Sequence, residues 1–347
     1  MKAFVISGPG QAGVEDVGPP DAGPGEVVID VTRAGICGTD VEFYTGEMQY
    51  LHDGNASYPI RIGHEWMGTV SAIGEGVDTT WMGRRVTGDT MLGCGECRRC
   101  RTGHHHVCEF RTELGIRHGR PGALAEQLAF PARYLHALPD TVTDAAGALV
   151  EPGGNAWRSV EAAGLREGDR VLILGPGTIG LLCALFARAA GAEVHLMGRP
   201  GRSLEFARTF EFDGVWTEQD LPALRWDAVI DCSNAPHLPA KALELVEPGK
   251  RIVHVGLAGR PSLIDTRMLV LGDITAVGIL GASAGLAPTI TSFASGTVDP
   301  TPLIAASVTL EELAGVLAGE RPAGAGAGPK IQVEISRASG GDQEDAR

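Results

Sequence analysis

Two groups of metal-type side chains and one glycine-rich turn carry most of the chemistry in this sequence. The first group is scattered along the first half of the chain: Cys37, Thr39, His64, Glu65 and Glu151. The second group is clustered: Cys94, Cys97, Cys100 and Cys108. The turn follows at residues 175–180, Gly-Pro-Gly-Thr-Ile-Gly. An open metal site, a closed metal site and a phosphate-binding turn on one chain predict metal-assisted hydride transfer.

The spacing of the clustered cysteines, C-x2-C-x2-C-x7-C, puts four thiolates on one short loop and suits a tetrahedral structural zinc. An iron–sulfur cluster is the main alternative, but the ferredoxin run closes with x3 and Cys-Pro, whereas this one closes with x7 and Cys-Glu. A zinc ribbon for nucleic acid is the other alternative, and the acidic chain disfavours it. The cysteines outside both groups, Cys183 and Cys232, are expected to be small core residues.

The glycine turn follows an apolar run at residues 170–174 and opens a helix expected over residues 179–190. This context distinguishes a dinucleotide-binding turn from an ordinary strand–helix connection. Gly175, Gly177 and Gly180 permit the tight turn, the approach of backbone to pyrophosphate and the helix–strand packing. The helix N-terminus at Thr178 and Ile179 then offers free N–H groups to the phosphates.

The end of the second strand predicts which nicotinamide cofactor binds. An NAD-binding fold usually places Asp or Glu there, whereas this chain has Gly198, followed by Arg199 and Arg202. A guanidinium group can bind a 2′-phosphate, and the glycine leaves room for it. We therefore expect NADP to be preferred, with NAD as the alternative. The alternative is that Arg199 and Arg202 are ordinary solvated loop charges. Replacing Gly198 by Asp and Arg199 by Ala should move the preference towards NAD, and a double variant that still favours NADP would contradict the assignment.

Composition limits the partners. The formal charge of −14 disfavours nucleic acid and anionic membrane surfaces. Neither a signal peptide nor a membrane-spanning apolar run is visible, so a cytoplasmic location is expected.

At 347 residues the chain is long enough for two domains. Up to about residue 150 short strands alternate with glycine and proline, which predicts an antiparallel, barrel-like domain. From about residue 155 strands alternate with helices, which predicts a doubly wound parallel sheet. A final strand at residues 330–335 is expected to return to the first domain, and the chain from Ser336 is expected to fray.

The segments around Cys37, His64 and Glu151, together with the cysteine lobe and the glycine turn, resemble the zinc-dependent medium-chain dehydrogenases. The resemblance covers essentially the whole chain and is nearest the sorbitol, threonine and glucose dehydrogenase branches. It implies a GroES-like β-barrel catalytic domain over residues 1–152 and 286–347, with a structural zinc lobe at about residues 90–112. A Rossmann domain would occupy residues 153–285.

Carried over by position, Cys37 and His64 match the family's catalytic zinc ligands. Glu65 matches an adjacent acidic residue that can bind the metal, and Glu151 matches a glutamate of the sorbitol, threonine and glucose branches. Such a set leaves one coordination position for the substrate oxygen. The resemblance implies two zinc ions per chain, one catalytic and one structural.

Three further residues gain roles from the resemblance. Thr39 matches a hydroxyl that passes the alcohol proton outward, although it could also be an ordinary turn residue. Many relatives have His where this chain has Glu42, and a carboxylate there could accept a substrate hydroxyl or be solvated. Glu113 matches a position that contacts sugar hydroxyls in the glucose branch, with a buried structural role as the alternative.

These expectations predict a zinc-dependent oxidoreductase acting on a secondary alcohol of a sugar, polyol, cyclitol or amino-alcohol, or on the matching ketone. A threonine-dehydrogenase-like oxidation of an amino acid is the first alternative. A zinc-free quinone or enoyl reductase is disfavoured because Cys37, His64 and Glu151 are all present. A non-enzymatic nucleotide sensor would need a damaged open site, and none is seen. Members of this family form dimers or tetramers, so the resemblance implies a homodimer or homotetramer.

Overall fold

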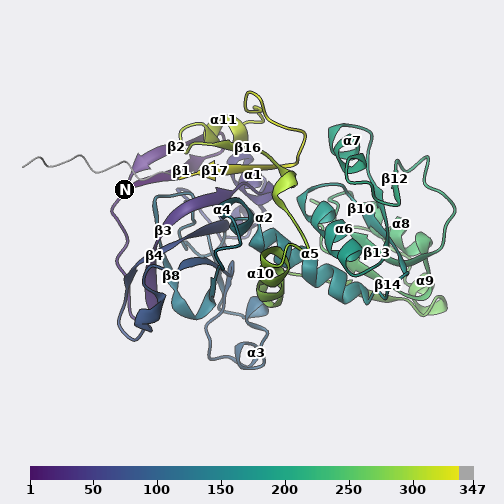
Figure 1. The fold of residues 1–347 in the computed structure, drawn as a ribbon, viewed down its shortest axis with the longest axis horizontal. Helices are drawn as coiled ribbons and strands as arrows, with labels where there is room; N and C mark the ends of the chain where they lie inside the picture. The colour runs from purple at the N-terminus through teal and green to yellow at the C-terminus, as the bar shows by residue number, and fades with distance from the viewer. Residues whose placement is uncertain (336–347) are drawn as a thin grey trace, which may run out of the picture.

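Short apolar runs between glycine and proline form the strands of the first lobe. The computed structural model describes residues 1–335, and in it these strands build a seven-stranded sheet in the order β16-β17-β3-β4-β5-β9, with β8 paired to β3 (Figure 1). Their bounds are Glu26–Gly35 (β3), Glu65–Ile73 (β4), Arg85–Gly88 (β5), Gln127–Pro131 (β8), Leu135–Ala137 (β9), Ile304–Val308 (β16) and Lys330–Glu334 (β17). All pairs are antiparallel except β16 with β17, which is parallel. The antiparallel pattern expected up to about residue 150 is confirmed, since β16 and β17 both come from the end of the chain.

A dense apolar core holds this sheet and fixes the strands that carry the candidate site. Ile29 on β3 and Trp66 on β4 are fully buried, together with Phe4 of a hairpin formed by β1 (Lys2–Gly8) and β2 (Gln11–Asp16). The ring of Trp66 meets that of Phe130 edge-on, with centroids 5.1 Å apart. Such packing lowers the freedom of the backbone on either side of β3 and β4.

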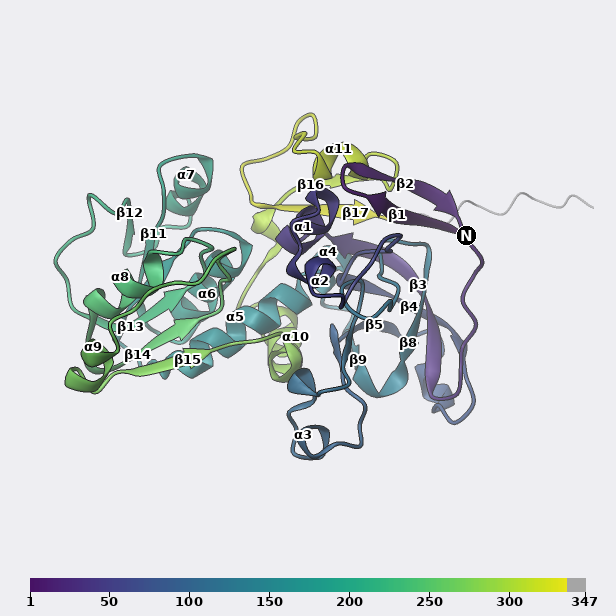
Figure 2. The ribbon, with the colours of Figure 1, turned by 180° about the vertical axis from the view of Figure 1, so that it is seen from behind.

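Short elements connect the strands of the first lobe: α1 (Gly38–Thr45), α2 (Gln49–His52), β6 (Met91–Leu92), α3 (Arg98–Arg101), β7 (Thr112–Glu113) and α4 (Asp144–Gly147). Figures 1 and 2, which view the molecule from opposite sides, both place α1 and α2 on the side of the sheet that faces the second lobe. The cysteine segment around α3 projects away from the sheet.

The second lobe is a six-stranded parallel sheet in the order β12-β11-β10-β13-β14-β15. Its strands are Arg170–Leu174 (β10), Glu193–Met197 (β11), Gly214–Trp216 (β12), Trp226–Asp231 (β13), Val246–His254 (β14) and Thr275–Gly278 (β15). Its helices are Val150–Ala163 (α5), Thr178–Ala189 (α6), Arg202–Arg208 (α7), Leu238–Leu245 (α8), Thr266–Leu271 (α9) and Leu286–Ala294 (α10). Strand order reverses between β10 and β13, which makes the crevice at their carboxyl ends the place for a dinucleotide.

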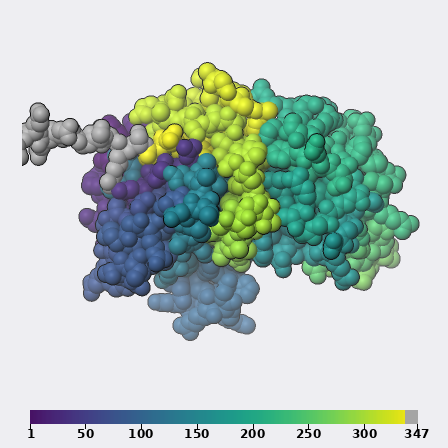
Figure 3. Space-filling model, in the orientation of Figure 1, coloured from purple at the N-terminus to yellow at the C-terminus, as the bar shows by residue number. Residues whose placement is uncertain are grey.

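The two lobes are joined by α5 and by the chain that returns after α10. In Figure 3 the yellow-green segment containing α10 lies over the boundary between the lobes. Beyond it, α11 (Leu313–Leu317) leads to β17, which pairs with β3 through Gln332 and Gly35, so the predicted return of the last strand is confirmed. The predicted fraying from Ser336 lies outside the described residues. None of the helices within residues 1–335 is long and apolar enough to cross a bilayer.

Candidate active site

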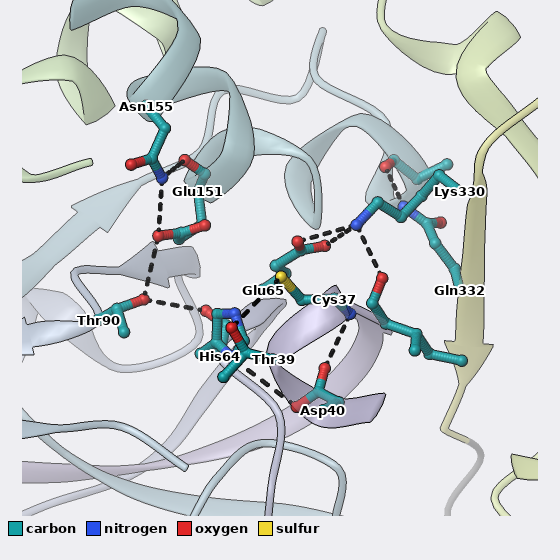
Figure 4. Close-up of polar contacts among 12 residues, drawn as sticks. Cys37, Thr39, Asp40, His64, Glu65, Thr90, Glu151, Asn155, Lys330 and Gln332 are labelled. Atoms are coloured by element: carbon teal, nitrogen blue, oxygen red, sulfur yellow. Dashed lines mark hydrogen bonds and ion pairs between the residues drawn. The ribbon is translucent and has the colours of Figure 1, made fainter. Parts of the chain in front are cut away.

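Two neighbouring strands bring the first group of ligands together. Cys37 follows the end of β3 and caps α1, while His64 and Glu65 stand at the start of β4. The pairing of Gly35 with Glu65 sets these two strand ends beside each other. As a result, ligand atoms of Cys37, His64 and Glu65 all lie within 4.8 Å of one another (Figure 4). The structure therefore assembles three of the four predicted ligands of the catalytic metal.

The surroundings of His64 fit a bound cation. His64 is buried, and its Nδ1 lies 3.8 Å from Oδ1 of the fully buried Asp40, with neither atom in a hydrogen bond. Asp40 is fixed because its Oδ2 accepts a hydrogen bond of 2.8 Å from the backbone N–H of Cys37. Burial alone would lower the pKa of His64, but Asp40 and the Cys37 thiol raise it well above its usual range. This pocket favours positive charge, and a thiolate, an imidazole and a carboxylate suit zinc.

Lys330 fixes the carboxylate of Glu65, and sequence reasoning missed this residue. Its Nζ donates to Oε1 and Oε2 of Glu65 at 2.8 and 2.6 Å and to the carbonyl of Ile36 at 2.9 Å. Both side chains are almost completely buried. Since all three protons of the ammonium group are used, the ion pair is well satisfied. Its strand reads Lys-Ile-Gln-Val-Glu, and nothing in this alternating pattern marks the lysine as the partner of a carboxylate on β4.

Glu151 lies apart from the other three predicted ligands. It stands in the first turn of α5, and its Oε1 lies 3.1 Å from Nδ2 of Asn155 and 3.4 Å from the hydroxyl of Thr90. Burial, opposed by His64 and reinforced by Glu65, raises the pKa of Glu151 to about 7. Figure 4 shows Glu151 on the opposite side of the cluster from Lys330. Its role as a metal ligand stays a prediction, and Thr90 and Asn155 are residues that the sequence did not single out.

The three residues with secondary roles lie around this cluster in different environments. The Thr39 hydroxyl is 4.0 Å from the Cys37 sulfur, in the first turn of α1. Glu42 is exposed on the same helix. Glu113 is buried, and its Oε1 accepts hydrogen bonds from Arg111 at 2.8 Å and Tyr50 at 3.3 Å. A direct contact of Glu113 with substrate stays a prediction, and its observed partners favour the structural alternative.

The clustered cysteines form a second metal-type centre. Their four sulfur atoms lie within 4.8 Å of one another, with Cys94 and Cys100 at 3.9 Å and Cys97 and Cys108 at 3.7 Å. A tetrahedron of zinc–sulfur bonds of about 2.3 Å requires sulfur–sulfur distances of about 3.8 Å. Backbone N–H groups of Cys97 and Glu96 point at the Cys94 sulfur and lower its pKa to about 6. All seven cysteines are free thiols, and these four fit a closed zinc site.

The glycine turn has the backbone geometry of a phosphate cradle. Gly175 has a φ of +99°, a conformation that side chains rarely adopt, and Gly177 caps the N-terminus of α6. A Cβ atom on Gly180 would collide with the carbonyl oxygen of Gly175. Thr178 and Ile179 are the first residues of α6, so their N–H groups are free for a ligand.

Gly198 proves to be constrained by the turn itself. A Cβ atom there would lie 2.5 Å from Cδ of Pro176, so the glycine and the proline fit against each other. Arg199 and Arg202 are exposed beside it, and neither has an ion-pair partner among residues 1–335. Replacing Gly198 by Asp would therefore displace Pro176 and disturb the phosphate turn, which makes Arg199 the better position for testing cofactor choice.

Comparison with known proteins agrees with this geometry. The alcohol dehydrogenase GroES-like domain family matches residues 23–140, and the zinc-binding dehydrogenase family matches residues 178–295. L-threonine 3-dehydrogenase of Idiomarina loihiensis is 34% identical over 278 residues, covering 77% of this chain and 80% of that protein. A short chain alcohol dehydrogenase of Escherichia coli CFT073, complexed with NADH, has 26% identity and a TM-score of 0.87, covering 96% of this chain and 99% of that one. A putative zinc-binding dehydrogenase of Sinorhizobium meliloti 1021, bound to NADP, has 27% identity and a TM-score of 0.86, covering 96% of this chain and 98% of that one.

Proposed function

Because the chain belongs to the zinc-dependent medium-chain dehydrogenases, we propose that it transfers a hydride between a secondary alcohol and NADP. The substrate class is a sugar, polyol, cyclitol or amino-alcohol. The observation that carries the proposal is the convergence of Cys37, His64 and Glu65 at the N-terminus of α1, a helix on the side of the first lobe that faces the second (Figure 1). Two zinc ions per chain are part of the proposal, one in this cluster and one held by the four cysteines.

Different residues of this cluster and its surroundings would bind the metal, orient its ligands and transfer the alcohol proton. Cys37 and His64 would hold the zinc, together with Glu65 or Glu151, and a zinc ion there would polarise the substrate oxygen. Asp40 faces Nδ1 of His64, so that Nε2 is the nitrogen left for a metal. Lys330 holds the Glu65 carboxylate in place. The hydroxyl of Thr39, 4.0 Å from the Cys37 sulfur, would take the alcohol proton towards solvent.

Metal content and turnover test this function together. The purified protein is assayed by absorbance at the reduced-nicotinamide band with NADP and a panel of polyols, cyclitols, sugars and amino-alcohols. Two zinc ions per chain and turnover of at least one secondary alcohol are expected. One zinc ion per chain and no turnover would indicate a protein that keeps only the cysteine zinc site and has lost catalysis. No zinc would favour the zinc-free quinone and enoyl reductases.

Cofactor choice is tested at Arg199. Arg199→Ala removes a guanidinium group that would bind the 2′-phosphate, so the KM for NADP should rise by about 10–100-fold while that for NAD stays within about twofold. Arg225→Ala, which removes an exposed charge from the same lobe, is the matched control. An unchanged ratio of kcat/KM for the two cofactors in the Arg199 variant would exclude the NADP assignment.

The second candidate function is oxidation of an amino acid at its secondary alcohol. The observation that favours it is the 34% identity to L-threonine 3-dehydrogenase of Idiomarina loihiensis. L-threonine therefore belongs in the substrate panel beside the polyols. Turnover of threonine with none of the polyols would replace the first candidate by the second.

The proposal includes assembly of two or four copies. Strand β15 ends the parallel sheet, and three of its four residues are exposed. Beside it, Val270 and Leu271 of α9 are 79% and 86% exposed. An open strand edge with exposed apolar neighbours is suited to pairing with a second copy. Light scattering should give a dimer or tetramer, and Leu271→Asp should shift it towards the monomer. A cytoplasmic location stays a prediction.

A further inference from the structure

A group of polar side chains lies beside the candidate site and is not used by the mechanism above. It consists of Tyr50, Asn55, Arg111, Glu113 and Arg117, and is called the arginine cluster below. Glu113 is the centre: its Oε1 accepts from Arg111 Nε at 2.8 Å and from the Tyr50 hydroxyl at 3.3 Å, and it lies 3.9 Å from Arg117 Nη1. Arg117 also donates to Oδ1 of Asn55 at 2.9 and 3.2 Å and covers the ring of Tyr50 at 5.3 Å.

Backbone contacts connect this cluster to the metal ligands. The N–H of Leu114, next to Glu113, donates at 3.0 Å to the carbonyl of Thr90, whose hydroxyl lies 3.4 Å from Glu151. On the other side, the loop packs against the residue before His64, because a Cβ on Gly115 would lie 2.7 Å from the carbonyl oxygen of Gly63. Through Leu114 and Gly115, the arginine cluster is therefore joined to the residues beside Glu151 and His64.

The cluster also borders the space between the lobes. Tyr50 belongs to α2, which faces the second lobe in both Figure 1 and Figure 2. Met91, the strand partner of Glu113, lies close to Gly281 of the second lobe, since a Cβ there would be 3.0 Å from Met91 Cγ. Through α2 and the strand pair of Met91 with Glu113, the cluster therefore adjoins the boundary between the lobes.

The charges of the cluster do not balance. Two guanidinium groups share the single carboxylate of Glu113, and no other carboxylate in residues 1–335 forms an ion pair with either arginine. Both arginine side chains are only 16% exposed. Placing a cation in such surroundings costs free energy unless an anion is close. Arg111 meets Glu113 at 2.8 Å, whereas Arg117 has an amide oxygen as its nearest acceptor, so Arg117 lacks a full counter-ion.

We propose that Arg117, supported by Arg111, binds an anionic group of the substrate, so that the physiological substrate is a secondary alcohol bearing a carboxylate or phosphate. This inference rests on the proposed function and specifies its substrate class. Glu113 and Asn55 hold the two guanidinium groups in orientation, and the substrate anion supplies the missing charge. In a chain with a formal charge of −14, a local excess of positive charge near the site also directs an anion to it.

The experiment compares matched acidic and neutral secondary alcohols. The probes are 3-hydroxybutyrate with its primary amide, and gluconate with glucitol, and a phosphorylated alditol distinguishes phosphate from carboxylate. The wild-type enzyme should favour the acidic member of a pair by about tenfold or more in kcat/KM. Arg117→Gln should raise the KM for the acidic member by about tenfold and leave that for the neutral member within about twofold. Arg117→Lys should recover part of the preference, which a merely structural role would not produce.

Arg166→Gln is the matched control, because Arg166 is an exposed arginine on the second lobe and its loss changes the net charge equally. Equal turnover of acidic and neutral members by the wild type would overturn the inference while leaving the dehydrogenase function standing. An equal rise of both KM values in Arg117→Gln would overturn it too. If no probe is oxidised, binding of the same probes is measured by calorimetric titration in the presence of NADP. Tighter binding of the acidic member of each pair supports the inference. No binding of the acidic members, or binding equal to that of the neutral members, contradicts it.

Discussion

The two metal-type clusters of the first lobe are built in different ways. The four cysteines come from residues 94–108, and backbone N–H groups of the same loop point at their sulfur atoms. The cluster of Cys37, His64 and Glu65 instead depends on two strand ends, and its supporting residues Asp40 and Lys330 lie far apart in the sequence. The first contains only cysteine ligands, which suits a structural ion, whereas the second mixes ligand types in a buried, charged pocket.

This difference favours the proposed division, in which the cysteine cluster stabilises a loop and the other cluster acts on the substrate. The largest expected effect is therefore that of Cys37→Ser. Removing a ligand of the Lewis-acidic ion should lower kcat/KM by about 10³-fold or more, since such an ion contributes several kcal/mol to the transition state. Zinc content should fall by one ion per chain, and binding of NADP should survive. Cys183→Ala, a cysteine outside both clusters, is the control, and persistent activity in Cys37→Ser would remove the catalytic assignment.

Cys97→Ser should affect stability before chemistry. Losing one of four thiolates from a closed zinc site should cost several kcal/mol of local stability, because metal binding and folding of such a lobe are coupled. We expect loss of one zinc ion, a lower unfolding midpoint and faster proteolysis within residues 94–108, measured by metal analysis, calorimetry and limited digestion. Retention of both ions at unchanged stability would contradict a structural role for the four cysteines.

Lys330→Met tests whether the open cluster relies on its distant partner. The change leaves the buried carboxylate of Glu65 without a counter-ion, which should destabilise the fold by about 3–5 kcal/mol. Loss of this support should also lower metal affinity or kcat/KM by about 10–100-fold. The double variant Glu65→Gln with Lys330→Met should recover stability in denaturant titration without recovering activity. Wild-type activity in Lys330→Met would show that Glu65 needs no positioning.

The smallest effect is expected from Asn155→Ala. This change removes a hydrogen bond of 3.1 Å to Glu151, so kcat/KM should fall by about tenfold or less. Ser159→Ala, one turn further along α5, is the control, because its hydroxyl donates to the backbone carbonyl of Asn155 and not to Glu151. Activity that falls equally in both variants would assign the effect to the helix and leave Glu151 without a demonstrated role.

The sequence predicted most of the second lobe because its central strands β10, β11 and β13 are buried on both faces and read as apolar runs. The apolar run at residues 170–174 is found as β10, and the second strand, which ends before Gly198, is found as β11. The glycine turn was predicted for the same local reason, since its spacing is set by one strand and one helix. The parallel pairing of β16 with β17 was not predicted, because the local sequence at residues 304–308 does not indicate which strand they pair with.

The candidate site was predicted less completely. Lys330 and Thr90 act through contacts with residues 265 and 61 positions away, so their spacing carried no signal. Asn155 stands four residues after Glu151 on the same helix, and this helical spacing was the signal that could have identified it.

Glu113 differs from these. Its flanking residues Arg111 and Arg117, two before and four after it, were visible in the sequence as charge partners. Considering Glu113 together with Arg111 and Arg117 would have favoured the interpretation of Glu113 as an ion-paired structural residue.

Lys330 also has a consequence for how the enzyme comes into being. It stands 265 residues downstream of the carboxylate that it holds, on a strand whose Val333 completes the core of the first lobe, whereas the core of the nucleotide lobe ends at Leu303. During synthesis on the ribosome, the nucleotide lobe can thus fold while the reactive centre still lacks one charge. The appearance of catalytic activity, and not the formation of secondary structure, would then report that β17 has paired with β3.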